Sequence, residues 1–154
     1  MDTDHNAAMA AAPATMPTAI SGATIGLAAL AGLGAAVAGA ALWALVTVLT
    51  NYELGIMAVV VGFMVGRAII FVAKHGNATL GFVGAACALF GCVLGNLLSA
   101  VGFAAQAWNV TYFDALMHLN VALATRLMTV SFSAMDLIFY AIGIYEGYRF
   151  SSRA

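Results

Sequence analysis

The sequence predicts an all-α fold, a four-helix transmembrane bundle with an amphipathic interfacial helix between spans three and four. Of the 154 residues, 64% are hydrophobic and 7% are charged, whereas about a quarter of the residues in soluble domains are charged. The apolar residues gather in four long runs, and a further segment has the periodicity of an amphipathic helix. A water-facing chain of this size could not bury so much apolar surface, so lipid is its expected solvent.

Residues 1–21 are predicted to form a flexible N-terminal tail, and residues 22–154 a single membrane domain. The tail is rich in Ala, Thr and Pro, and such a composition buries too little apolar surface to offset the entropy of ordering. Its first residues include Asp2 and Asp4, where a secretory signal would carry a basic segment.

The four apolar runs define the predicted spans, at residues 25–49, 54–73, 80–105 and 134–150. A helix that crosses a bilayer core needs about 20 apolar residues, and the first three runs meet that length. The fourth run is shorter and carries Asp136 and Glu146. Its prediction therefore depends on the apolar centre at residues 137–145.

Residues 111–130 are predicted to form the amphipathic helix, with Thr111 in a capping position. At 100° per residue, its polar side chains fall within about 60° of one another, opposite the large apolar ones. These polar residues are Asp114, His118, Thr125 and Thr129. Because Trp108 and Tyr112 are typical of membrane interfaces, we expect this helix to lie along the membrane surface or to cover the bundle.

Basic residues predict the orientation of the spans. Lys74 and His75 follow the second span, and Arg149 and Arg153 follow the fourth. Short cytoplasmic segments carry an excess of basic residues, so we expect both termini in the cytoplasm. Arg126, in the amphipathic segment, is the single opposing residue.

Two Ser/Thr-x-x-acid patterns predict helix caps, Thr50 with Glu53 before the second span and Ser133 with Asp136 before the fourth. In a capping box the hydroxyl accepts a hydrogen bond from a free N–H of the first turn, and the acid accepts one from the N–H of the cap residue. The negative charge also suits the positive end of the helix dipole. A catalytic acid pair of Glu53 and Asp136 is the alternative.

Glycines form two regular stripes, Gly55, Gly62 and Gly66 in the second span and Gly84, Gly91, Gly95 and Gly102 in the third. Each stripe lies close to a single line along its helix. Small residues permit close backbone contact between helices in lipid, and Gly-x-x-x-Gly is the recurrent form. We expect spans two and three to pack on each other through these stripes. A stripe that binds another subunit, and a glycine-lined pore, are the alternatives.

The same stripes predict which glycines tolerate substitution. Leucine at Gly62 or Gly95 should destabilise the bundle by overpacking. Leucine at Gly76, between spans two and three, should be tolerated.

Arg67, Asn96 and Glu146 are the predicted intramembrane polar residues. Arg67 and Glu146 lie at similar depths, and charges within spans often pair, so an ion pair between them is expected. An alternative of equal weight is that Arg67 reaches the lipid headgroups and Glu146 pairs with Arg149. Asn96 is placed to hydrogen-bond across helices to either residue.

No motif predicts a metal, a cofactor or an active site. Cys87 and Cys92 lie within one apolar run and are expected to be buried packing residues. The histidines, His5, His75 and His118, fall in separate segments. Five Lys and Arg stand against six Asp and Glu, without the basic excess that nucleic acid binding requires. The expected partners are membrane lipid and other membrane protein subunits, or a second copy of the chain.

Two segments carry a resemblance to known proteins. Tyr52-Glu-Leu-Gly55 with the following Gly62 and Gly66, and the final DLIFYAIGIYEGYRFS that begins at Asp136, together resemble a group of small bacterial multi-span inner-membrane proteins. The likeness covers residues 25–105 and 133–152. It implies a Gly-rich body, a short last segment that starts with Asp, and a bacterial inner membrane, and it brings no assigned activity.

These observations favour a non-enzymatic structural or accessory subunit that associates through Gly-lined helix faces. One alternative is a small channel or transporter with a polar site at Arg67 and Glu146. Another is an enzyme that acts on lipid through Asp114 and His118.

Overall fold

The computed structural model describes residues 20–153. Helices make up 84% of the described part, which contains no strand, so the all-helical prediction is confirmed. The predicted tail lies outside the described residues except for Ile20 and Ser21.

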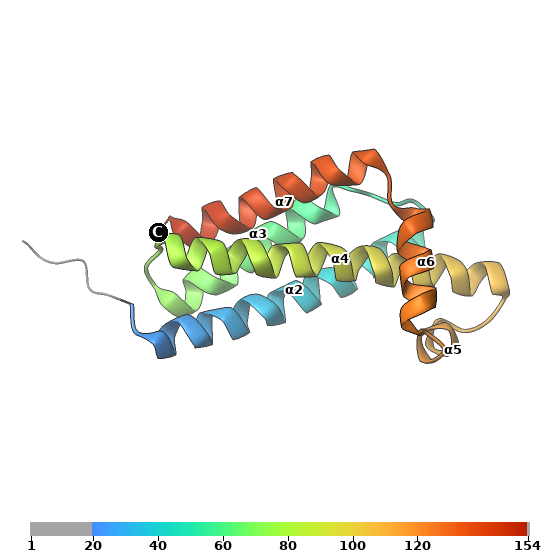
Figure 1. Cartoon of the computed structure of the whole chain (residues 1–154), viewed down its shortest axis with the longest axis horizontal. Helices are drawn as coiled ribbons and strands as arrows, with labels where there is room; N and C mark the ends of the chain where they lie inside the picture. The colour runs from blue at the N-terminus through green and yellow to red at the C-terminus, as the bar shows by residue number, and fades with distance from the viewer. Residues whose placement is uncertain (1–19, 154) are drawn as a thin grey trace, which may run out of the picture.

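Within the described range the helices are α2 (Gly22–Thr50), α3 (Met57–Ala73), α4 (Ala78–Trp108), α5 (Tyr112–Met117), α6 (Val121–Ser131) and α7 (Ala134–Ser152). α2 contacts α3 and α4, and α7 contacts α3 and α4 from the other side. Figure 1 shows these four helices running side by side, with α6 standing across the far end of α4. By length and composition, α2 and α4 can each cross a membrane, and the bent pair α6 and α7 counts as a third candidate.

The two ends of the molecule differ. α2 begins and α7 ends at one end, which we call the terminal end, and α5 and α6 lie at the other, which we call the α6 end (Figure 1). Asn51, Lys74 and Asn109 end α2, α3 and α4 in the left-handed conformation, with φ of 55°, 66° and 53°. This conformation is a common way to end a helix, and Asn is one of the residues that tolerate it.

The predicted amphipathic helix at 111–130 is broken in two. α5 ends at Met117 and α6 begins at Val121, because polar side chains cap both ends of the break. The His118 ring Nδ1 lies 2.8 Å from the Asp114 carbonyl oxygen, and Asn120 Oδ1 accepts from the Leu123 N–H at 2.9 Å. The single polar face predicted for this segment therefore does not form. The two short helices pack on the end of α4 through a small apolar cluster around Val101, Ala105 and Ala115.

The predicted cap at Thr50 and Glu53 is wrong. Thr50 is the last residue of α2, and its hydroxyl donates to the Val46 carbonyl at 2.7 Å. α3 begins only at Met57, after a turn closed by the Met57 N–H on the Leu54 carbonyl at 3.0 Å. The hydroxyl is bonded within the preceding helix, which leaves Glu53 in the loop.

At the start of α7, Ser133 and Asp136 form a capping box. The Ser133 N–H donates to Asp136 Oδ2 at 2.7 Å. Asn77 caps α4 in a similar position, accepting from the Leu80 N–H at 2.8 Å. The Asn77 cap was not predicted, although Asn is among the favoured N-cap residues.

Candidate functional site

The glycine stripe of α3 faces α7, contrary to the prediction that it faces α4. A Cβ at Gly62 would collide with the carbonyl oxygen of Gly143, and one at Gly66 would collide with Phe150. At Gly55, in the turn just before α3, it would enter the ring of Phe139. The whole of this stripe is therefore closed by the last helix of the same chain.

The stripe of α4 is divided between two neighbours. Gly84, near the terminal end, meets the Gly147 carbonyl of α7. Further along, a Cβ at Gly95 would lie 2.9 Å from Trp43 Cε3, and those at Gly91 and Gly102 would meet α2 at Ala36 and Val48. The α4 stripe thus packs mainly on α7 and α2, with Val61 of α3 also touching Gly91.

α7 contributes a glycine pair that the sequence reasoning missed. Gly143 and Gly147 have the Gly-x-x-x-Gly spacing, and both are buried. A Cβ at Gly143 would lie 2.5 Å from the Ala58 carbonyl of α3, and one at Gly147 would lie 2.8 Å from the Gly84 carbonyl of α4. α7 therefore packs against both α3 and α4 with backbone contact to each. The spacing was visible in the sequence as GIYEG.

Other glycines have different surroundings. Gly22, Gly26 and Gly34 of α2 have nothing within 4 Å of an added Cβ. At Gly76 the Cβ would lie 2.6 Å from the Ser152 carbonyl carbon. The prediction that Gly76 tolerates leucine is therefore wrong, because the end of α7 packs on that loop.

Buried polar side chains gather toward the α6 end. Among the described residues the buried polar side chains are Thr47, Asn96, Ser99, Asp136 and Ser151. The first four belong to the last turns of α2, the second half of α4 and the first turn of α7. These four residues and the buried side chains of Trp43 and Tyr140 make up what we call the polar cluster.

Contacts between helices hold the polar cluster together. The Tyr140 hydroxyl of α7 donates to the Cys92 carbonyl of α4 at 3.1 Å. The Trp43 ring of α2 packs edge-on against Tyr140, with the ring centroids 6.5 Å apart. Ser99 donates back to the Gly95 carbonyl at 2.8 Å. Three helices therefore converge on this cluster.

Several atoms of the polar cluster have no hydrogen-bond partner. They are Trp43 Nε1, Thr47 Oγ1 and the Asn96 side-chain oxygen Oδ1, while the Asn96 amide nitrogen lies close to the Tyr140 hydroxyl. All three side chains are fully buried. A buried polar group without a partner costs about 1–3 kcal/mol, so these atoms require an explanation other than packing.

Glu53 lies in the loop between α2 and α3, near Asp136. Partial burial raises the pKa of Glu53 above its usual range, and the neighbouring Asp136 carboxylate raises it further. The two acids that the sequence placed before separate spans thus lie close enough for their charges to interact.

Arg67 and Glu146 are not brought together. Arg67 is exposed on α3 and Glu146 is half-buried on α7, and within residues 20–153 neither takes part in an ion pair at 4.0 Å. The glycine contacts between α3 and α7 set this arrangement, since they align Gly62 with Gly143 and place both charged side chains off the contact face. The expected Arg67–Glu146 pair is absent, as is the alternative pair of Glu146 with Arg149. Asn96 is bonded to neither Arg67 nor Glu146.

Asp114 and His118 take part in local helix termination. The Thr111 hydroxyl donates to Asp114 Oδ2 at 2.6 Å and accepts from the Asp114 N–H at 3.2 Å. His118 caps the other end of the same short helix. Cys87 and Cys92 are both buried with free thiols.

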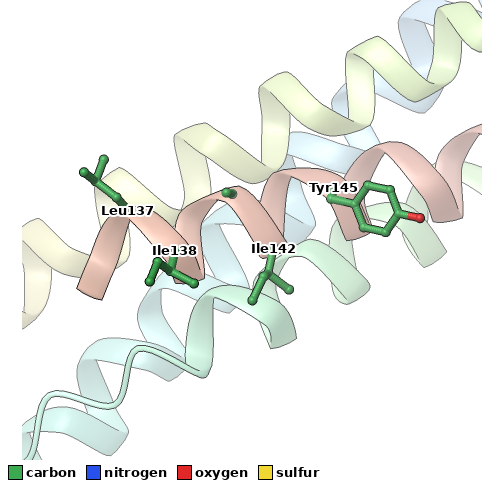
Figure 2. A pocket seen from close by; sticks show the side chains of 5 residues that line it. Leu137, Ile138, Ile142 and Tyr145 are labelled. Carbon is green, nitrogen blue, oxygen red and sulfur yellow. The ribbon is translucent and has the colours of Figure 1, made fainter. Parts of the chain in front are cut away.

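The outer face of α7 is apolar. A shallow pocket of about 460 Å³ lies on it, lined by Leu137, Ile138, Ala141, Ile142 and Tyr145. Figure 2 shows these side chains projecting from α7. A second apolar groove, of about 430 Å³, lies between α2, α4 and α5 beside Val48, Leu98 and Tyr112.

Comparison with known protein families, curated proteins and solved structures gives no match.

Proposed function

We propose that this chain is a four-span protein of the bacterial inner membrane, with both termini in the cytoplasm. In this proposal it acts, without enzymatic chemistry, as a structural or accessory subunit of a larger membrane assembly or of a homo-oligomer. The exposed apolar outer face of α7 carries the subunit role, and the membrane bundle is carried by the close glycine-mediated contact of α7 with α3 and α4. Such contact is typical of helices that associate in lipid, where hydrophobic force between helices is weak.

The four-span arrangement is supported by the lengths and contacts of the two less apolar helices. α3 has 17 residues and α7 has 19, or about 26 and 28 Å at 1.5 Å per residue, against a hydrocarbon core of about 30 Å. Both helices lie alongside α4. Large apolar side chains such as Leu30, Phe71 and Phe82 point outward, with more than 60% of their surface exposed, as lipid-facing residues do.

The orientation is supported by the position of the basic residues. Lys74 and His75 follow α3, and Arg149 and Arg153 lie at the end of α7. The two segments meet at the terminal end, because Gly76 packs on Ser152 and Arg153. A single cytoplasmic cluster of basic residues follows the positive-inside tendency.

Partners would bind surfaces other than the glycine stripes, since these are occupied within the chain. The apolar outer face of α7, with Ile138 56% exposed and Tyr145 55% exposed, is one surface open to lipid or to another subunit (Figure 2).

The test is crosslinking in the native membrane. A photoreactive amino acid at Ile138 should give a discrete crosslinked protein, or a dimer of the chain, whereas the same residue at buried Val65 should give none. The purified chain should also migrate as a complex in mild detergent. A lone monomer together with lipid-only crosslinks from Ile138, Leu30 and Phe82 would contradict the proposed subunit role.

A channel or transporter centred on Arg67 and Glu146 is the weaker proposal, since these side chains lie apart. Its test is ion flux into proteoliposomes that Glu146→Gln abolishes.

A further inference from the structure

The polar cluster draws oxygen-bearing side chains from three helices, α2, α4 and α7. Asp136 and Tyr140 are one turn apart on α7 and so share a face. The Tyr140 hydroxyl reaches the Cys92 carbonyl of α4 at 3.1 Å, and Asn96 follows Cys92 by one turn. On α2, the Trp43 ring contacts Tyr140. Thr47 lies one turn after Trp43 on the same helix.

The unpartnered atoms of this cluster point to a ligand. Asn96 and Thr47 are fully buried, and the side-chain oxygens of both have no hydrogen-bond partner. Two oxygens on different helices are thus desolvated without compensation in the protein. A bound group that coordinates both would remove the cost of leaving them unpaired.

Charge narrows the class of ligand. Asp136 is 7% exposed, and no Lys, Arg or His of residues 20–153 forms an ion pair with it. The same residues contain no group of three or more His, Cys, Asp or Glu side chains suited to a metal. The cluster therefore combines one buried carboxylate with neutral oxygens, which matches a single positive charge.

We propose that the polar cluster binds a small monovalent inorganic cation, with Asp136, Asn96 and Thr47 as oxygen ligands. Carboxylate, amide and hydroxyl oxygens are the ligands that hard cations prefer. The Tyr140 hydroxyl donates to the Cys92 carbonyl and lies close to the Asn96 amide, so its remaining lone pair makes it a further candidate ligand. The site is independent of the accessory role proposed above, and it lies away from Arg67 and Glu146.

The experiment uses the full chain in lipid nanodiscs, with Na⁺ as the probe. Thermal unfolding is followed over a range of NaCl concentrations, with N-methyl-D-glucamine chloride holding the ionic strength constant. A cation that binds only the folded state raises the unfolding midpoint in a saturable manner. We expect this increase in Na⁺, and an apparent Na⁺ affinity at least about tenfold weaker in Asn96→Leu, which removes one ligand.

Ser151→Ala is the matched control. The Ser151 hydroxyl is also fully buried and unpartnered, but it lies at the terminal end of α7 beside Gly84. The Na⁺ dependence should survive this substitution. Equal Na⁺ dependence in wild type and Asn96→Leu would overturn the proposal. An unfolding midpoint that CaCl₂ raises and NaCl does not would overturn the choice of a monovalent ion.

A second measurement does not depend on whether Asn96→Leu folds. Trp43 and Trp108 are the two tryptophans of the chain, so Trp108→Phe leaves Trp43 as a reporter within the polar cluster. Its fluorescence should change saturably as Na⁺ replaces N-methyl-D-glucamine. A cluster occupied only by water would give no difference between the two cations in either measurement, and that result would refute the cation site.

Discussion

Single glycines of this chain have opposite surroundings, although the sequence alone treats them alike. An added Cβ at Gly62 meets the Gly143 carbonyl oxygen, whereas at Gly34 it meets nothing within 4 Å. The backbone oxygen cannot move aside as a flexible side chain does, so even the smallest substitution at Gly62 forces α3 and α7 apart. At Gly34 the same methyl group projects away from the other helices.

We predict that Gly62→Ala lowers the free energy of unfolding by about 1–3 kcal/mol through overpacking. Gly34→Ala should leave it unchanged or raise it by up to about 1 kcal/mol, because alanine favours the helix over the unfolded chain. Denaturant titration in mixed micelles measures both. Similar losses at the two positions would contradict the packing assigned to Gly62.

The surroundings of Glu53 predict that stability decreases as the pH rises. A carboxylate held in an ion pair would have the opposite effect. Its pKa is raised in the folded protein by partial burial and by Asp136, so the folded state binds the proton more tightly than the unfolded state. Stability from this group is therefore present at low pH and falls as the pH rises from the ordinary carboxyl range through the raised pKa.

We expect Glu53→Gln to flatten this slope and to stabilise the protein at neutral pH, most clearly at low salt because Glu53 is exposed to solvent. Unfolding midpoints measured between pH 4 and 8 test this expectation. Asp114→Asn, in α5, serves as the control carboxyl. A slope of the same size in wild type and Glu53→Gln would show that another group causes it.

At the scale of elements, the sequence located the long helices more accurately than their partners. The apolar runs predicted each long helix to within a few residues of its observed ends, because length and hydrophobicity alone specify them. The glycine stripes marked positions of close contact, yet they carry no information on which helix occupies each groove. The prediction paired the stripes of spans two and three with each other. α3 and α4 do contact directly, at Val61 and Gly91, but the α3 stripe packs on α7.

The break between α5 and α6 was missed for a local reason. Helical periodicity continues through residues 111–130, so the pattern gives no sign of an interruption. The polar caps at His118 and Asn120 end one helix and start the next. Asn competes with helical backbone hydrogen bonds through its side chain, and this was the signal that could have located the break.

We predict that Asn120→Ala loosens α6 alone. Loss of the bond to the Leu123 N–H should cost about 0.5–2 kcal/mol of local stability and so increase amide hydrogen exchange over Val121–Ser131. Exchange in α2 and α4 should not change. Thr129→Ala, which removes a hydroxyl bonded to the Thr125 carbonyl within the helix, should have little effect. Faster exchange throughout the chain would show that the cap supports the whole fold.

The polar cluster became visible only at the scale of the whole molecule. Its residues come from α2, α4 and α7, which are far apart in sequence, and Thr47 and Ser99 have no distinctive spacing. Sequence reasoning selected the charged residues Arg67 and Glu146, because a charge in an apolar run is conspicuous. Asn96 was selected as a polar residue that follows Gly95 as Arg67 follows Gly66, but its surroundings depend on the packing of Trp43 and Tyr140.

α7 gives the whole molecule its arrangement, since it contacts α3 on one side and α4 on the other. Its aromatic residues mark both contacts. Phe150 packs against Phe63 of α3 with the ring centroids 5.2 Å apart, and Tyr148 packs against Phe82 of α4 at 5.4 Å. The α7 glycines allow this approach, so the last helix is an integral part of the fold and its glycine face is not available to a partner.

Crosslinking of α7 to α3 tests this central claim most directly. Phe63→Cys and Phe150→Cys are combined in a chain that carries Cys87→Ala and Cys92→Ala, and a short thiol crosslinker is applied in native membranes. We expect a crosslink within one chain, seen as a monomer of altered mobility that neither single-cysteine variant produces. Crosslinked dimers with no crosslinked monomer would contradict it, because the α3 groove would then hold α7 of another chain.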